Sequence, residues 1–319
     1  MNFELNEDDV ALVDAISSVC RAKFPIDVVR SMQGGLRRDL WEELATTGVF
    51  NIRLPESDGG AGLGFTQSVL IFEELGKWLV PGPLIATHLA AGTIDGADDG
   101  SRIVGYIDIE DSPIVVEHFG AVDMLIGGGA DSMVCIDPGQ MKAELLGNPF
   151  DPQTPVWTAQ ELPQGIKVYD ADQTELFKLR AACLSAAFLL GIAGRCVESA
   201  VEYSLQRKQF DRPIGSFQAV KHLLADALTR TEVCRASVYA AGVTLDDPSV
   251  GNVSRAALGA KLLASDAAIA NARTSIQVHG GMGFTWEVDA HLYLKRAIVM
   301  ATGFSTPEQC ALSLADFLA

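Results

Sequence analysis

The sequence predicts a mainly α-helical fold with a small central β unit, and three observations lead to this prediction. Apolar residues recur at helical spacing through the first hundred residues. Short β-rich runs separated by Gly, Asp and Pro follow, from about residue 101 to residue 170. Beyond Asp172 proline becomes rare and helical periodicity returns, so three long helices are predicted at about 174–208, 216–245 and 251–279.

The first hundred residues predict a set of amphipathic helices. Four segments show the helical spacing of apolar residues: 7–24, 39–47, 66–79 and 84–96. Gly48 is placed to end the second helix, and a glycine-rich loop, LPESDGGAGLG, follows at 54–64. The loop resembles a phosphate cradle, but it follows no predicted strand and has neither GK[ST] nor a correctly spaced GxGxxG, which favours a turn that joins two helices.

The middle of the chain predicts a small antiparallel β unit. The runs IVGYIDI, PIVVEHF, DMLIGG, SMVCI and GIKVYD are short and rich in β-branched residues. We therefore expect three domains: an N-terminal helical domain at 1–100, a reduced middle β domain at 101–172, and a C-terminal helical bundle at 173–319.

Composition excludes several classes of protein. The 319 residues are 48% hydrophobic and 20% charged, which is typical of a folded globular chain rather than a disordered one. The net charge of −17 disfavours nucleic acid and anionic membranes as partners. The apolar run 181–194 is too short to span a bilayer and predicts a buried helix. The first residues show no export signal, so we expect a cytoplasmic protein.

Candidate metal and nucleophile motifs are weak. The six cysteines are scattered without CxxC, so we expect reduced core thiols and no zinc site. No GxSxG elbow supports a serine hydrolase. Glu287, Asp289 and His291 alternate in a way that could suit a metal, but no second ligand cluster accompanies them, so a solvated or interface face is the preferred interpretation.

Two other segments carry more chemistry. The sequence RKQFDRPIGSFQ at 207–218 lies at a predicted helix-to-helix turn, where an arginine, a glutamine and a phenylalanine can bind a phosphate and cover a flat ring. Residues 178–235 hold nine Lys/Arg against five Asp/Glu, so this region is locally basic. The second segment, QVHGGMGF at 277–284, has paired glycines that allow close backbone approach to a ligand; a simple helix cap with a tight turn is the alternative.

These motifs, taken in order, resemble the acyl-CoA dehydrogenases. The similar stretches are LPESDGGAGLG, EELGK at 73–77, RKQFDRPIGSFQAVKHLLAD at 207–226 and QVHGGMGF. The resemblance implies a fold with an N-terminal helical domain, a middle β domain and a C-terminal four-helix bundle. It also implies FAD at a subunit interface, where both turns of one subunit hold the pyrophosphate and adenosine of the flavin in the neighbour.

Mapped residue by residue, the resemblance assigns cofactor binding to nine positions. They are Arg207, Gln209, Phe210, Ile214, Phe217, Gln218, Gln277, Gly280 and Gly281. One position departs from the family pattern, because Asp211 stands where the family usually has glycine after the phenylalanine.

The family's catalytic glutamate is missing from both of its usual positions. Acyl-CoA desaturation needs a carboxylate that takes the α-proton while the flavin takes hydride from the β-carbon. The two family positions correspond here to Ala181 and to Phe304, within ATGFSTP, and neither side chain can accept a proton. The segment 101–170 also lacks the family's Thr-Glu-Pro…Gly-Ser-Asp and Trp-Ile-Thr/Ser motifs, which line the flavin ring.

This pattern is similar to that of the shorter, non-catalytic subunit of actinobacterial α2β2 acyl-CoA dehydrogenases. The resemblance implies that a longer partner supplies the base, the flavin-ring pocket and most of the site for a bulky, steroid-derived acyl-CoA. The stretch TWEVDAHLYLKR at 285–296 also resembles that subgroup. Two alternatives stay open: an autonomous dehydrogenase with Glu175 or Glu287 as a displaced base, and a non-enzymatic helical scaffold.

Overall fold

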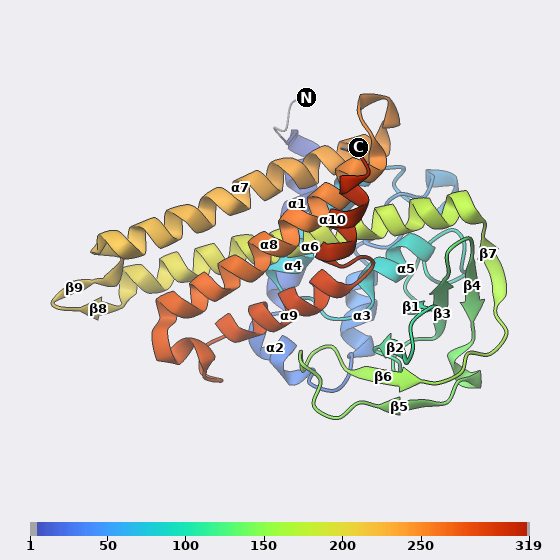
Figure 1. Cartoon of the computed structure of the whole chain (residues 1–319), viewed down its shortest axis with the longest axis horizontal. Coiled ribbons are helices and arrows are strands. Elements are labelled where there is room, and N and C mark those ends of the chain that lie inside the picture. The colour runs from blue at the N-terminus through green and yellow to red at the C-terminus, as the bar shows by residue number, and fades with distance from the viewer. Residues whose placement is uncertain (1–4, 318–319) are drawn as a thin grey trace. The chain divides into compact units, whose positions relative to one another are not determined.

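The chain forms two compact units in the computed structural model, which describes residues 5–317 (Figure 1). The first unit, here called the bundle unit, consists of the residues up to Ser18, Val69–Leu79 and the residues from Ala182 onward. The second, here called the sheet unit, consists of Val19–Ser68 and Val80–Ala181. The predicted fold class, mainly α with a small β unit, is confirmed.

The N-terminal region is helical as predicted. Its helices are α1 (Glu7–Lys23), α2 (Ile26–Ser31), α3 (Arg38–Ala45), α4 (Phe65–Lys77) and α5 (Leu84–Ala90). The loop 54–64 joins α3 to α4 and includes the short 3-10 helix η1 (Glu56–Asp58). The helix predicted at 84–96 is too long, because α5 ends at Ala90 and the backbone then turns at Gly92, whose φ is 78°.

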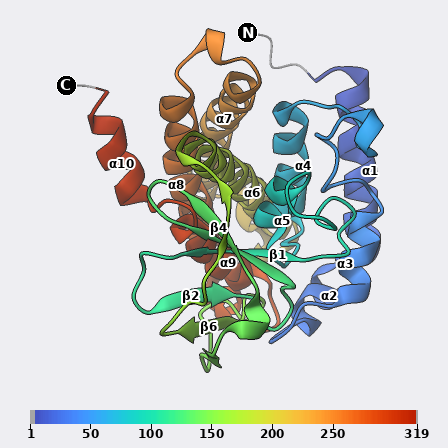
Figure 2. The same cartoon turned by 90° about the vertical axis from the view of Figure 1, so that its right-hand side faces the viewer.

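The strands of the sheet unit form two small sheets. They are β1 (Val104–Asp108), β2 (Ile114–Glu117), β3 (Met124–Gly128), β4 (Met133–Ile136), β5 (Ala143–Leu145), β6 (Val156–Ala159) and β7 (Ile166–Tyr169). The four-stranded sheet has the order β1-β3-β4-β7 and the three-stranded sheet the order β2-β6-β5. In Figure 2, β2 and β6 lie below β1 and β4.

The prediction of a wholly antiparallel unit is wrong for one pair of strands. β1 and β3 are parallel, with Val104 opposite Met124 and Asp108 opposite Gly128. The strand between them, β2, leaves this sheet and pairs with β6 in the other one. The connection from β1 to β3 is therefore a crossover rather than a hairpin, and a crossover is what parallel strands require.

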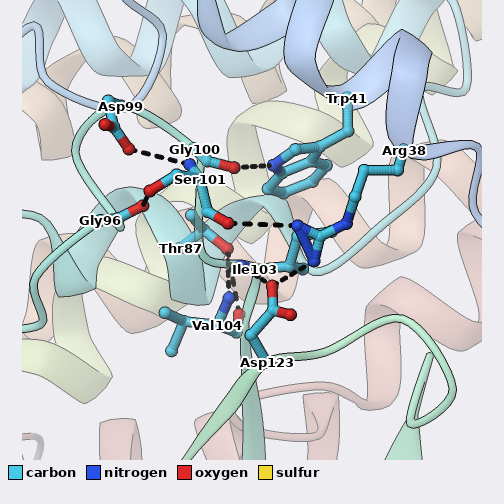
Figure 3. Close-up of polar contacts among 10 residues, drawn as sticks. All are labelled: Arg38, Trp41, Thr87, Gly96, Asp99, Gly100, Ser101, Ile103, Val104 and Asp123. Carbon is cyan, nitrogen blue, oxygen red and sulfur yellow. Dashed lines mark hydrogen bonds and ion pairs between the residues drawn. The ribbon is translucent and has the colours of Figure 1, made fainter.

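Polar contacts connect α3, α5 and the start of the sheet (Figure 3). Arg38 forms an ion pair with Asp123, whose carboxylate also accepts a hydrogen bond of 2.8 Å from the Ile103 backbone N–H. The buried Trp41 indole donates to the Gly100 carbonyl at 3.0 Å. The Thr87 hydroxyl of α5 donates to the Val104 carbonyl at 3.1 Å. Side chains thus satisfy backbone groups that precede or begin β1, which fixes where the sheet starts.

Long helices dominate the C-terminal half. They are α6 (Ala171–Gln206), α7 (Gln218–Asp246), α8 (Val253–His279), α9 (Ala290–Thr302) and α10 (Pro307–Ala315). Three of them begin and end within a few residues of the predicted stretches. Within the described residues, α6 alone is long and apolar enough to cross a membrane, but 83% of its most apolar window is buried inside the protein. This burial confirms the prediction of a buried helix at 181–194.

Close backbone contact between α4 and α6 organises the bundle unit. A Cβ on Gly191 would lie 1.9 Å from the Glu73 carbonyl oxygen, and one on Gly76 would lie 2.0 Å from the Phe188 carbonyl oxygen. Because no side chain fits at either position, both must be glycine for the helices to approach this closely. The Glu73 side chain turns instead toward α7, where Arg235 forms an ion pair with it and the Tyr239 hydroxyl donates a 2.8 Å hydrogen bond.

Candidate functional site

The RKQFDRPIGSFQ segment forms a short hairpin between α6 and α7. Its strands are β8 (Lys208–Gln209) and β9 (Arg212–Pro213), and the 3-10 helix η3 (Ile214–Ser216) leads into α7. Figure 1 shows the hairpin projecting beyond the ends of both helices. Phe210 and Asp211 form the two-residue turn with φ of 53° and 60°. Such turns require two left-handed residues, a conformation that aspartate tolerates, so Asp211 can stand where glycine would otherwise be used.

The aromatic side chain at the hairpin tip is the most exposed large apolar residue of this turn. Phe210 is 87% exposed, and its ring meets the edge of Phe217 at a centroid distance of 6.1 Å. Arg212 covers the Phe217 ring, with Cζ 4.1 Å from its centroid. A bulky residue with positive φ is strained by about 1–2 kcal/mol. Phe210 therefore combines a strained backbone with a ring that is almost fully exposed.

Arg207 has a fixed backbone and a solvent-facing side chain. Its N–H donates to the Tyr203 carbonyl at 2.9 Å, and its own carbonyl accepts a 2.8 Å hydrogen bond from the Ile214 N–H. Within the described part of the chain, its guanidinium makes no hydrogen bond or ion pair. It is therefore available to an external anion. The neighbouring Gln209 amide donates to the Lys208 carbonyl at 2.8 Å, and Gln218 contacts His222 at 3.3 Å.

The second motif lies where α8 ends. Gly280 is the C-cap of this helix, with φ of 65° and ψ of −144°, and its N–H donates to the Gln277 carbonyl. This backbone conformation is open essentially only to glycine, so the helix-cap interpretation is correct for Gly280. A Cβ at Gly280 or Gly281 would meet no atom within 4 Å. The backbone of both glycines thus faces open space, and Gln277 beside them is exposed.

The structure brings the two motifs to the same end of the helices. Tyr203, one turn before Arg207, stacks on His279, which directly precedes Gly280; the ring centroids are 4.3 Å apart and the planes differ by 29°. His279 is in turn oriented through a 2.8 Å hydrogen bond between Nδ1 and the Ser275 carbonyl. A basic hairpin and a glycine turn are therefore held side by side through a packed aromatic pair.

Sequence reasoning missed a group of exposed apolar residues at these two turns. They are Leu205, Met282, Phe284 and Trp286. The sequence shows apolar residues beside both motifs. It does not show that these side chains are exposed, because their exposure depends on how the ends of the helices pack. Such residues are typical of a surface that binds a partner or ligand.

Glu287, Asp289 and His291 do not form a metal-binding cluster, and no such cluster occurs among the described residues. His291 is buried and packs edge-on against Trp286, with the ring centroids 4.9 Å apart. The expected face was solvated or part of an interface, and a solvated setting is wrong for this residue. Glu287 is exposed. Lys295 also packs on the Trp286 indole, with Nζ 5.2 Å from the ring centroid.

The two family positions for a catalytic base hold apolar side chains in the structure. Ala181 on α6 is fully buried in the sheet unit. Phe304 follows α9 with φ of 61°, in the bundle unit. The displaced-base candidates, Glu175 and Glu287, are both exposed to solvent.

Family models match most of this chain. The model for the acyl-CoA dehydrogenase N-terminal domain matches residues 6–97, and that for the C-terminal domain matches residues 173–310. The acyl-CoA dehydrogenase IpdE2 of Mycolicibacterium smegmatis is 34% identical over 300 residues, which cover 92% of this chain and 93% of IpdE2. The acyl-CoA dehydrogenase FadE34 of Mycobacterium tuberculosis is 33% identical over 84% of this chain, which spans only 41% of the length of FadE34.

Solved structures share the fold. One chain of the ChsE4-ChsE5 complex from Mycobacterium tuberculosis has a TM-score of 0.85 and 20% identity, covering 100% of this chain and 99% of that chain. A chain of the Tcur3481-Tcur3483 steroid ACAD G363A variant has a TM-score of 0.83 and 22% identity, covering 98% of each.

Proposed function

We propose that this chain, which belongs to the acyl-CoA dehydrogenase family, acts as the non-catalytic subunit of a heteromeric acyl-CoA dehydrogenase. In this role it supplies the adenosine and pyrophosphate half of a shared FAD site to a longer catalytic partner in an α2β2 assembly. The enzyme is then an oxidoreductase acting on CH–CH bonds, but this chain contributes no catalytic residue. We call the two neighbouring turns, 207–218 and 277–284, the clamp. The observation that carries the proposal is the contrast between this exposed clamp and the apolar residues at both base positions.

The residues at the clamp fit the group that the family implies. FAD, when bound, supplies the hydride acceptor for desaturation of the acyl chain. The Arg207 guanidinium is exposed and has no described partner inside the chain, which suits a pyrophosphate. The uncovered backbone at Gly280 and Gly281 allows a flat or charged group to approach closely. The remaining assigned residues of the first motif, which lie in the hairpin around Arg207 and at the start of α7, are Gln209, Phe210, Ile214, Phe217 and Gln218. Gln277 belongs to the second motif, in the last turn of α8.

The names of structurally similar complexes support the substrate class that we propose. A two-component complex with the same fold carries the name steroid ACAD, and a second complex pairs ChsE4 with ChsE5. We infer a bulky, steroid-derived acyl-CoA, held mainly by the partner subunit in the cytoplasm. No observation favours the autonomous dehydrogenase or the scaffold protein over this assignment.

Flavin stoichiometry tests the proposal most directly. The chain is expressed alone and together with candidate longer subunits, and released flavin is measured by absorbance against protein mass. We expect the single chain to be colourless and poorly soluble, because the clamp lacks a flavin-ring pocket and exposes apolar residues. We expect two FAD per α2β2 complex. A yellow, active homo-oligomer with one FAD per chain, or four FAD per tetramer, would refute the assignment.

A further inference from the structure

A cavity in the sheet unit carries chemistry that the proposed function does not use. It has a volume of about 290 Å³ and lies between the segment around Phe50, α5 and the first turns of α6. Two arginines, Arg53 and Arg180, and the imidazole of His88 contribute its basic groups. We propose that this cavity binds a small organic carboxylate, with the carboxylate held by the two arginines and the apolar body held by the neighbouring leucine and phenylalanine side chains.

The charge of the cavity is opposite to that of the protein. The chain as a whole carries −17, yet neither Asp nor Glu occurs among the described residues that line this cavity. Both arginines are half-buried, so their charge is less screened than that of a surface arginine. An anion that enters therefore meets two positive charges in a partly dehydrated setting, where charge-assisted hydrogen bonds are strong.

Both guanidiniums line the same cavity as the imidazole of His88. Burial is the main cause that lowers the pKa of His88 to about 4, and the nearby charges of Arg53 and Arg180 contribute in the same direction. Its Nδ1 lies 2.8 Å from the Val49 carbonyl, so this nitrogen carries the proton and the ring is neutral at pH 7. The positive charge of the cavity thus comes from the arginines, each of which lies close enough to affect the same buried ring.

The rest of the lining selects a ligand with an apolar part. Leu54, Leu176 and Phe177 contribute apolar surface beside the basic groups. The cavity volume of about 290 Å³ is the volume that roughly ten water molecules occupy in the liquid. This space fits one ring or a short chain with its carboxylate, and it is too small for a CoA thioester. The proposal is independent of the FAD clamp, because every residue that it uses belongs to the sheet unit.

Binding of benzoate to the full chain, alone or with its partner, tests this proposal by calorimetry. Benzamide, which has the same shape without the charge, is the neutral comparison. We expect saturable benzoate binding that is at least about tenfold tighter than benzamide binding. Arg53→Gln and Arg180→Gln should each weaken benzoate binding by about tenfold or more, since each removes a charge-assisted contact. Arg21→Gln, which removes an exposed arginine elsewhere in the unit, should leave it unchanged.

A measurement on the unmodified protein guards against variants that fail to fold. Phenylglyoxal labels accessible arginines, and mass spectrometry reports the labelled positions. Benzoate should protect Arg53 and Arg180 but not Arg21. Equal binding of benzoate and benzamide, absence of saturation up to roughly 10 mM, or labelling that benzoate does not change would overturn the proposal. Inorganic phosphate that binds as tightly as benzoate would show a general anion site and overturn the carboxylate assignment.

Discussion

Between α4 and α7 the guanidinium of Arg235 meets the buried carboxylate of Glu73, whereas at the hairpin between α6 and α7 the guanidinium of Arg207 faces solvent. Both arginines belong to the bundle unit. The Glu73 carboxylate is almost completely buried and also accepts a hydrogen bond from Tyr239, so the pair satisfies groups that would otherwise be costly inside the protein. The guanidinium of Arg207 contacts no hydrogen-bond or charge partner within the described residues, although hydrogen bonds fix the backbone N–H and carbonyl of this residue.

The two arginines differ in whether their own chain supplies the partner of the charge. A buried charge whose partners lie in the same chain is explained by folding alone. An exposed charge beside a strained turn contributes little to folding, and in the function proposed here a second molecule supplies its partner.

Arg235→Ala should destabilise the protein by about 3 kcal/mol or more, because it leaves the Glu73 carboxylate buried without its charge partner. Chemical denaturation of the full chain or complex measures the loss. Arg255→Ala, which removes an exposed arginine of the same unit, is the matched control and should change the free energy of unfolding by no more than about 0.5 kcal/mol. Equal losses of unfolding free energy in the two variants would contradict the structural role of Arg235.

Acidification should destabilise the protein through His88, a second buried polar group. Burial, followed by the charges of Arg53 and Arg180, lowers its pKa from 6.5 to about 4 in the folded state. Between these values the unfolded chain binds a proton that the folded chain does not bind, so stability falls as the pH drops from about 6.5 to 4. The contribution is roughly 3 kcal/mol.

Unfolding free energies measured between pH 7 and pH 4 test the role of His88. The variant His88→Gln should lose this pH-dependent component, whereas His222→Gln, which alters an exposed histidine, should keep it. If the free energy of unfolding depends on pH as steeply in the His88 variant as in the unchanged protein, protonation of this imidazole does not cause the loss of stability.

Arg207→Ala should leave stability unchanged and weaken FAD retention in the co-expressed complex. Loss of a charge-assisted contact of about 1.5–3 kcal/mol corresponds to roughly 10- to 150-fold weaker binding. FAD titration into the apo-complex measures it. Arg207→Lys should restore only part of the affinity, because an ammonium cannot form the bidentate contact. The chemical step at saturating FAD should change little. If the alanine variant assembles and binds FAD normally, the clamp assignment fails.

Phe210→Asn should raise stability slightly, by at most about 1 kcal/mol, because asparagine tolerates the left-handed backbone at the hairpin tip. The same variant should reduce FAD retention or complex formation, since it removes the exposed ring. Asp211→Gly at the next position keeps the ring and should retain both properties. Thermal unfolding and flavin content report the two effects, and a Phe210 variant that is less stable would show that the ring serves its own fold.

Much of the fold and of the candidate site could be predicted from local patterns. The spacing of apolar residues located the long helices, because burial of one helix face repeats every three to four residues. Residue types predict a cofactor-binding site at 207–218 and 277–284, and the sequence itself shows that Ala181 and Phe304 carry no carboxylate. The division into three domains and the nine assigned cofactor contacts stay predictions.

Other features depended on contacts that no local pattern contains. The parallel pairing of β1 with β3 arises because β2 joins a different sheet, a choice made by packing between distant segments. The Tyr203–His279 stack, which unites the two motifs, joins residues far apart in the sequence. The cavity around Arg53 and Arg180 likewise exists only once α5 and α6 are placed.

The family, the helical periods and the missing base can all be recognised from the sequence, since each depends on residue type and spacing along one segment. The tertiary structure decided which charges are buried, as at Glu73, and which face solvent, as at Arg207. The same residue types occur in both settings, so composition cannot distinguish them. The physical reason is that the energy of a charge depends on the solvent and partners around it, and only the folded arrangement of distant segments supplies these.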